Sequence, residues 1–319
     1  MLPLVSQKKI WFIKKMNLLL KKIERLKNDR NAVILAHNYQ LGEIQDIADF
    51  TGDSLGLSIK AAETEADVIV FCGVRFMAET AAILSPQKTV LLPDKEAGCP
   101  MADMITAEQL KDLKAKNPDA LVVCYVNSSA EVKAQSDYCC TSSNAAEVVN
   151  SLADDRRIIF VPDRHLGQFV TEKSGQDIVL WPGFCHVHVI ITEDDIREAK
   201  AKLPDAIVMA HPECTEPVKK LADELLSTSQ MLSFAAKSPA KQFIVATEIG
   251  IIHTLKKQNP DAEFIAASKR AICPNMKKIT LEKVAWALED MQYKITVPEQ
   301  IREKAKRALD RMVAILPTG

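Results

Sequence analysis

Nine short apolar runs alternate with amphipathic or polar segments along this 319-residue chain. Each run is rich in Val, Ile, Leu, Phe or Ala, which is typical of strands buried on both faces of a parallel sheet. Strands that alternate with helices at short spacing predict parallel sheets between layers of helices, an α/β fold. The predicted strands are Ala32–Tyr39, Asp67–Cys72, Lys88–Pro93, Ala120–Tyr125, Arg157–Val161, Asp177–Trp181, Ala206–Ala210, Gln242–Ala246 and Glu263–Ala267.

The segments between these runs predict helices. Amphipathic helices are expected over 17–30 and 298–319, and another over Phe76–Leu84. A threonine that can cap a helix N-terminus stands at three equivalent places, so helices are expected to begin at these positions, and one more near Ser54. The three threonines are Thr106, Thr192 and Thr280.

The first run occurs three times, as Ala32–Tyr39, Ala120–Asn127 and Ala206–Glu213. The offsets are 88 residues (125 − 37) and 86 residues (211 − 125), which is too long a period for a solenoid of small repeats. We therefore expect three small α/β domains around a pseudo-threefold axis, each a parallel sheet between helices. A single doubly wound sheet of six to nine strands is the alternative, but it does not explain the matched positions. The predicted domains are 16–104, 105–190 and 191–280, with helices in 281–319 packing back on the first and 1–15 as an N-terminal extension.

Three sets of polar residues recur in register with this repeat. Each copy of the run ends in two polar residues spaced two apart, which point the same way on an extended segment. A hydroxyl follows at the expected start of the next helix, and a cysteine lies in the loop that closes each unit. Because ligands of parallel α/β units bind beyond the carboxyl ends of the strands, all three sets should face one central cavity. The sets are His37/Tyr39, Tyr125/Asn127 and His211/Glu213; Ser54, Ser142 and Thr228; and Cys99, Cys185 and Cys273.

These residue types indicate a site for anionic substrates and a metal. Hydroxyls at helix N-termini suit carboxylates and phosphate. A single cysteine before a helix is more often a small buried residue than a ligand, but its occurrence in all three units favours shared use. Three thiolates could hold zinc with a water, or a [4Fe–4S] cluster with one iron free of protein ligands. We favour the cluster, because its three-iron corner matches a threefold donor set and its open iron can promote loss of hydroxide.

Composition narrows the functional classes. The net charge of −1 offers no basic surface for nucleic acid. The N-terminal residues have no apolar core of a secretion signal, and Met16 is a plausible start of the regular pattern, so we expect a cytoplasmic protein without a membrane segment. Eight cysteines without a Cys-x-x-Cys pair then favour buried thiols, catalysis or metal binding over disulfides.

Several motifs together resemble the quinolinate synthase family (the A protein of de novo NAD biosynthesis). The resemblance runs from about Asn17 to about Met312. It implies three pseudo-symmetric α/β domains around one site and the condensation of iminoaspartate with dihydroxyacetone phosphate to quinolinate, phosphate and two waters. The motifs are His37-Asn-Tyr39, Gly52-Asp-Ser54, Cys99-Pro-Met-Ala-Asp103, Tyr125-Val-Asn127, Thr141-Ser-Ser-Asn144, Gly183-Phe-Cys185-His-Val-His188, His211-Pro-Glu-Cys214, Ser227-Thr-Ser229 and Cys273-Pro-Asn-Met276.

The resemblance also implies roles for individual residues. Cys99, Cys185 and Cys273 would hold a [4Fe–4S] cluster. Glu213 would be the general base, as the only carboxylate among the strand-end pairs, and Tyr39 and His188 would assist proton transfer. The residues that would hold the substrates' carboxylates and phosphate are His37, Ser54, Tyr125, Asn127, Ser142, His211 and Thr228, with Glu213 beside them.

Two other functions compete with this one. A hydro-lyase could use the same cluster on another hydroxy acid, and a non-enzymatic iron–sulfur sensor is the third possibility. A sensor has no need of converging His, Tyr and Glu side chains. For the synthase, a functional link to an aspartate oxidase or dehydrogenase is expected, because iminoaspartate hydrolyses readily and must be supplied nearby.

Overall fold

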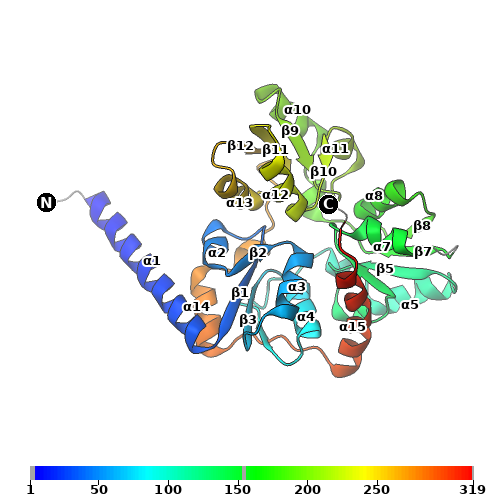
Figure 1. The fold of residues 1–319 in the computed structure, drawn as a ribbon, viewed down its shortest axis with the longest axis horizontal. Coiled ribbons are helices and arrows are strands. Elements are labelled where there is room, and N and C mark those ends of the chain that lie inside the picture. Colours follow the sequence, from blue (N-terminus) through cyan, green and yellow to red (C-terminus); the bar gives the residue numbers. More distant parts are fainter. Residues whose placement is uncertain (1–3, 153–155, 318–319) are drawn as a thin grey trace.

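A computed structural model describes residues 4–152 and 156–317. In these residues, the strands form three separate four-stranded sheets in which every pairing is parallel (Figure 1). The sheets have the same strand order, β2-β1-β3-β4, β6-β5-β7-β8 and β10-β9-β11-β12. The predicted α/β fold of three small units is therefore confirmed, and the alternative of one doubly wound sheet is wrong.

The strands of the three sheets follow one another in chain order. The first sheet has β1 (Ala32–His37), β2 (Phe50–Gly52), β3 (Val68–Cys72) and β4 (Thr89–Leu91). The second has β5 (Leu121–Tyr125), β6 (Tyr138–Cys140), β7 (Ile158–Val161) and β8 (Ile178–Leu180). The third has β9 (Ile207–Ala210), β10 (Glu224–Leu225), β11 (Gln242–Ala246) and β12 (Glu263–Ala266).

Helices connect these strands and cover the sheets (Figure 1). The first unit has α1 (Leu4–Asp29), α2 (Gly42–Ile47), α3 (Ser54–Glu63), α4 (Arg75–Leu84) and the 3₁₀ turn η1 (Ala102–Met104). The second has α5 (Ala107–Ala115), α6 (Ala130–Lys133), α7 (Ala145–Ser151), α8 (Arg164–Ser174) and α9 (His186–Val189). The third has α10 (Glu193–Lys202), α11 (Glu216–Lys220), α12 (Thr228–Lys237), α13 (Ile251–Gln258) and η2 (Met276–Lys278), and α14 (Leu281–Asp290) and α15 (Glu299–Ala314) end the chain.

Each sheet contains a short edge strand that the sequence analysis missed, namely β2, β6 and β10. A strand of two or three residues is too short to show a periodic pattern. Each is held by an aspartate just before it, whose carboxylate accepts a 2.8 Å hydrogen bond from a backbone N–H of the neighbouring strand. These aspartates, Asp49, Asp137 and Asp223, form a fourth matched set, with offsets of 88 and 86 residues (137 − 49 and 223 − 137).

Local sequence explains where three of the longer helices begin. Thr106, Thr192 and Thr280 are the N-caps of α5, α10 and α14, and each side chain accepts a backbone N–H of the first turn. Such a cap stabilises a helix by about 1 kcal/mol, because it satisfies an N–H that has no partner within the helix. The predicted helix starts at these three threonines are confirmed.

Helix α1 begins at Leu4, and not at Asn17 as the sequence analysis expected. No proline or glycine interrupts Leu4–Asp29, so nothing in the sequence ends the helix within the predicted extension. The C-terminal part of α1 packs against α14, where Lys22 pairs with Glu289 at 2.6 Å. The other end of α1 extends away from the three sheets (Figure 1).

Helix α15 lies across the first two units, in contact with α4, α6 and β6. Asn144 ties it to the second unit by donating to the carbonyls of Met312 and Ile315 at 3.0 and 2.7 Å. The first two units also share one continuous apolar core with α14 and α15, whereas the third has separate apolar clusters. The division of the chain at residues 104, 190 and 280 stays a prediction.

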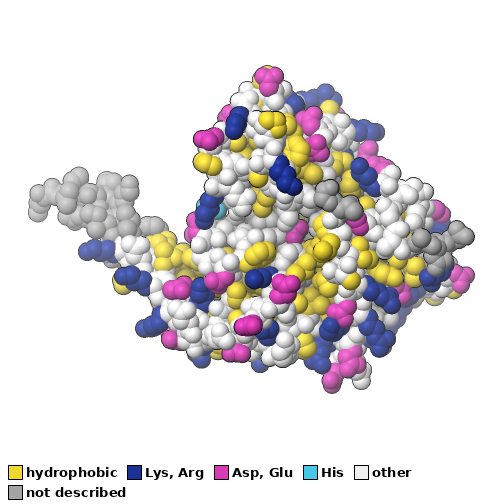
Figure 2. Space-filling view, viewed as in Figure 1, with side chains coloured by type: hydrophobic (Ala, Val, Ile, Leu, Met, Phe, Trp, Pro, Cys, Tyr) yellow, Lys and Arg dark blue, Asp and Glu magenta, His cyan; other side chains and the backbone are white. Residues whose placement is uncertain are grey.

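The surface charge and the helices can be compared with the expectations of no nucleic-acid surface and no membrane segment. On the face drawn in Figure 2, positive and negative side chains are interspersed over the three units. Among the described residues, no helix combines the length and the apolar character needed to cross a bilayer.

Candidate active site

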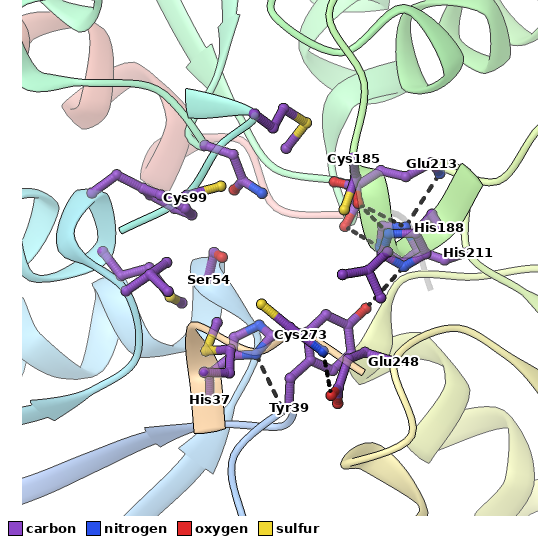
Figure 3. Close-up of a pocket in the computed structure, with 18 of the residues that line it drawn as sticks. His37, Tyr39, Ser54, Cys99, Cys185, His188, His211, Glu213, Glu248 and Cys273 are labelled. Atoms are coloured by element: carbon purple, nitrogen blue, oxygen red, sulfur yellow. Dashed lines mark hydrogen bonds and ion pairs between the residues drawn. The ribbon is translucent and has the colours of Figure 1, made fainter. Parts of the chain in front are cut away.

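One cavity lies where the three units meet, beyond the carboxyl ends of their strands (Figure 3). Side chains from all three sheets line it, and all thirteen residues predicted for the site are among them. Figure 3 shows His37, Tyr39, His188, His211 and Glu213 around this space. The structure therefore brings together every predicted site residue, while their individual roles stay predictions.

The strand-end pairs reach the cavity by a different geometry from the one expected. The first residue of each pair (His37, Tyr125 or His211) lies at the end of its strand or just after it. Tyr39 and Glu213, however, lie in turns and not on extended backbone. In both turns the N–H of the second residue donates to Nδ1 of the preceding histidine, at 3.1 Å in His37/Tyr39 and 3.2 Å in His211/Glu213. Because Nδ1 accepts a hydrogen bond, the neutral form of each ring carries its proton on Nε2.

The three matched hydroxyls are not equivalent in the structure. Ser54 and Thr228 are the first residues of α3 and α12, as predicted. Ser142 instead lies in the turn before α7, whose N-cap is Asn144. Its Oγ lies 3.1 Å from His211 Nε2, so this hydroxyl orients a histidine of another unit.

The three cysteine loops share one backbone structure. The third residue after β3, β7 or β11 donates its backbone N–H to the cysteine loop of its unit. The acceptor is the carbonyl of the residue two positions before the cysteine. The cysteine carbonyl in turn accepts from the N–H four residues ahead, so each thiol stands at the start of a short helical turn. These bonds are Arg75–Ala97 (2.8 Å), Arg164–Gly183 (2.9 Å) and Ile249–Ala271 (3.0 Å), then Asp103–Cys99 (3.3 Å), Val189–Cys185 (3.1 Å) and Lys277–Cys273 (3.3 Å).

A chain of polar contacts connects residues of the first, second and third units. Glu213 Oε2 lies 2.7 Å from His188 Nδ1, and both side chains are almost fully buried. On the other side of the ring, His188 Nε2 lies 2.8 Å from Thr247 Oγ1, which lies 2.6 Å from the Tyr39 hydroxyl. The direct distance from Tyr39 to His188 Nε2 is 3.4 Å.

Sequence reasoning missed Thr247 and its neighbour Glu248. Both follow the end of β11, where the rule that ligands bind beyond the carboxyl ends of parallel strands could have found them. Thr247 has no counterpart in the other two units and Glu248 matches an acid in only one of them, Asp163, so the search for positions matched in all three repeats did not find them.

Burial governs the charge states in the cavity. Burial lowers the pKa of His37 to about 3 and that of His211 to about 3, so both are neutral near pH 7. Burial and the nearby Glu213 carboxylate raise the pKa of Tyr39 and of Tyr125, which keeps both phenols protonated. Burial alone would raise the pKa of Glu213, but His188 and His211 beside it outweigh this effect and lower it.

Two sets of side chains could hold a metal. Cys185, His188 and Glu213 present ligand atoms within 4.8 Å of one another. Nε2 of His188 already has Thr247 as a partner, and its Nδ1 lies 2.7 Å from Glu213 without a hydrogen bond to it, so the histidine is better suited to moving protons. Cys99, Cys185 and Cys273 come one from each unit, are not joined in disulfides, and direct their thiols into the space between them (Figure 3).

The donor chemistry of these thiols fits a cationic group such as an iron–sulfur cluster. Burial raises the pKa of Cys99 to about 12 and also raises those of Cys185 and Cys273. Without a cation the three thiols stay protonated, whereas bound iron would stabilise the thiolates and release their protons. The three thiols could therefore hold such a group without Glu213 as a ligand.

A cavity at the junction of three parallel α/β units, lined by three thiols, neutral histidines and a buried carboxylate, defines an enzyme active site.

The family described as "Quinolinate synthetase A protein" matches residues 21–314. The quinolinate synthase of Geobacter metallireducens is 59% identical over 293 residues, or 92% of this chain and 96% of that protein. Quinolinate synthase 2 of Methanosarcina acetivorans is 55% identical over 301 residues, or 94% of this chain and 97% of that protein. The chain belongs to the quinolinate synthetase A family, which confirms the predicted family and the prediction of an enzyme.

Proposed function

We propose that this protein is a quinolinate synthase that condenses iminoaspartate with dihydroxyacetone phosphate to give quinolinate, phosphate and two waters. The observation that carries the proposal is a cavity lined by three thiols beside a buried chain of polar contacts from Glu213 to Tyr39. Family membership supports the same activity, because the similar proteins are named quinolinate synthases.

The cofactor in this proposal is a [4Fe–4S] cluster held by Cys99, Cys185 and Cys273. When bound, it supplies a Lewis-acidic iron without a protein ligand, which assists the departure of a hydroxyl group. The rest of the chemistry falls to side chains of this chain.

The cavity wall offers hydrogen bonds for anionic substrates. Neutral His37 can donate through Nε2, His211 Nε2 lies beside the Ser142 hydroxyl, and the hydroxyls of Ser54 and Thr228 stand on the first turns of helices, where anions are favoured. The Asn127 Oδ1 atom is buried without a hydrogen-bond partner among the described residues. A buried polar atom that lacks a partner costs stability, so this oxygen is available to accept a hydrogen bond from a substrate.

Protons move in this proposal between Tyr39 and His188, and Glu213 stands behind the histidine. If Glu213 accepts from His188 Nδ1–H, then His188 Nε2 is free to accept from the Thr247 hydroxyl, and Thr247 Oγ1 accepts from the Tyr39 hydroxyl. Tyr39 lines the cavity and can deliver a proton to a substrate or remove one. Glu213, the predicted general base, then acts through His188 by stabilising its protonated form, as the acid does in Ser-His-Asp triads.

Anaerobic purification followed by a product assay tests the proposal. We expect a brown protein with about four iron and four sulfide per chain that forms quinolinate from the two substrates. Glu213→Gln should retain the cluster and lose turnover. A colourless protein with zinc would contradict the cluster, and a loaded protein that forms no quinolinate would favour the hydro-lyase. The cytoplasmic location and the link to an aspartate oxidase or dehydrogenase are part of the same proposal.

A further inference from the structure

The second residue after β3, β7 and β11 lies just before the residue whose N–H bonds to the cysteine loop of its unit, and it differs between the units. It is Val74 in the first unit, Asp163 in the second and Glu248 in the third. The acids at the last two positions are completely buried. Each accepts the backbone N–H of the cysteine in its own unit: Asp163 from Cys185 at 3.1 Å and Glu248 from Cys273 at 3.0 Å.

Glu248 differs from Asp163 in that it also pairs with a lysine. Its Oε1 accepts from Cys273 N–H and lies 2.9 Å from Lys277 Nζ. Its Oε2 accepts from Gly250 N–H at 2.7 Å and from Lys277 at 3.2 Å. Every partner of this carboxylate is therefore a hydrogen-bond donor, and one of them is a cation.

Lys277 extends the same network to the first unit. Its ammonium also donates to the backbone carbonyl of Tyr39, in the turn that follows β1. Gly250 is needed for this close approach, because a Cβ there would lie 2.8 Å from Glu248 Oε2, from Lys277 Nζ and from the Tyr39 carbonyl carbon. Three backbone segments thus meet at one partly buried ion pair: the Cys273 loop, the start of α13 and the Tyr39 turn.

We propose that Glu248, held by Lys277, is a positioning residue that keeps the Cys273 thiol and the Tyr39 hydroxyl in fixed relation. This inference rests on the proposed function, in which Cys273 holds the cluster and Tyr39 transfers protons to the substrate. Glu248 touches neither reacting group itself. It acts through the Cys273 backbone and, by way of Lys277, through the Tyr39 backbone.

Three variants perturb the network in different ways. Glu248→Gln keeps the size of the side chain but turns an NH₂ group toward an N–H donor in either orientation of the amide. Lys277→Met removes the cation and the bond to Tyr39, and Lys277→Arg restores the charge. The matched control is Lys257→Gln, since Lys257 pairs with Asp46 at 2.7 Å and also joins the third unit to the first, but at the surface.

The first measurement is the rate of iodoacetamide alkylation at each cysteine of the metal-free full chain, followed by mass spectrometry. We expect Glu248→Gln to raise the rate per thiolate at Cys273 about tenfold relative to Cys99, with the thiolate fraction taken from the pH dependence of the same reaction because Glu248 also raises the pKa of Cys273; this rise corresponds to a loop that opens more easily. Lys257→Gln should leave this ratio unchanged. An unchanged ratio in Glu248→Gln would overturn the proposal, whether or not the wild-type protein binds a cluster or forms quinolinate.

The second measurement uses the cluster-loaded enzyme, with activity expressed per bound cluster. We expect Lys277→Met to lower kcat on the order of 10²-fold with little change in KM, because small displacements of a proton-transfer group are costly. Lys277→Arg should recover most of this loss. A lower melting temperature with unchanged kcat per cluster would show a merely structural role and would also overturn the proposal. Loss of activity in the wild type alone would instead contradict the proposed function.

Discussion

Replacing Thr247 by valine would remove the hydroxyl that connects Tyr39 to His188. This hydroxyl lies 2.6 Å from the Tyr39 hydroxyl and 2.8 Å from His188 Nε2, and valine can form neither hydrogen bond. At about 0.5–1.5 kcal/mol for each hydrogen bond, the substitution should destabilise the fold by about 1–3 kcal/mol. The direct contact of 3.4 Å between Tyr39 and His188 remains as a poorer path.

The effect on activity should exceed the effect on folding. General acid–base catalysis contributes about 10²–10⁴-fold to a rate, and the remaining direct path places Thr247→Val near the lower limit of about 10². A factor of 10² corresponds to about 3 kcal/mol of transition-state stabilisation. Thr247 does not line the cavity, so kcat and kcat/KM should fall together while KM changes little.

The assay is quinolinate formation by reconstituted enzyme, normalised to bound iron. Thr80→Val is the matched control, because Thr80 is equally buried and its hydroxyl donates at 2.8 Å within α4 to the Phe76 carbonyl. This control should cost some stability and leave kcat unchanged. A Thr247→Val enzyme with kcat within about threefold of wild type, or with a raised KM alone, would refute the proton path through this hydroxyl.

Three further predictions concern the cofactor, the pH dependence and the sheet edges. Cys185→Ser should lose most of the bound iron after reconstitution, whereas Cys214→Ser, at a buried thiol outside the cavity, should bind as much as wild type; equal loss would contradict the assigned ligands. Because the folded pKa of His37 lies near 3, below its value of 6.5 in the unfolded chain, acidification from pH 6.5 to 5 favours unfolding by at most about 1.4 kcal/mol per pH unit for this residue. Urea unfolding of the metal-free chain should therefore show a shallower loss of stability in His37→Gln over this range, and an unchanged slope would show that His37 is not buried in its neutral form. Asp137→Ala should lower the free energy of unfolding by about 1–2 kcal/mol, because the Val122 N–H loses its 2.8 Å partner, and no change would show that water replaces the carboxylate.

The repeated pattern was enough to find most of the site in advance. Apolar runs at fixed offsets indicated three equivalent units, and the polar residues at equivalent places all line one cavity. This worked because parallel strands place their carboxyl ends at the same edge of a sheet, so register in sequence becomes proximity in space. The same reasoning failed for residues that are not matched in all three units, which is why Thr247 and Glu248 were missed.

The sequence by itself determined the α/β class, the threefold repetition, the helix starts at the capping threonines and twelve of the thirteen predicted residues that line the cavity, all but His188, which was expected from the family resemblance alone. These features depend on local chemistry, namely side-chain periodicity, capping and spacing along the chain. Only the tertiary structure decided the short edge strands, the turn that orients Tyr39 and Glu213, the different position of Ser142, and the contacts that connect Glu213 to Tyr39. Those contacts join residues as much as 208 positions apart, and their distances depend on how three separate sheets pack together. No local pattern carries that information, since packing geometry is set by the whole core.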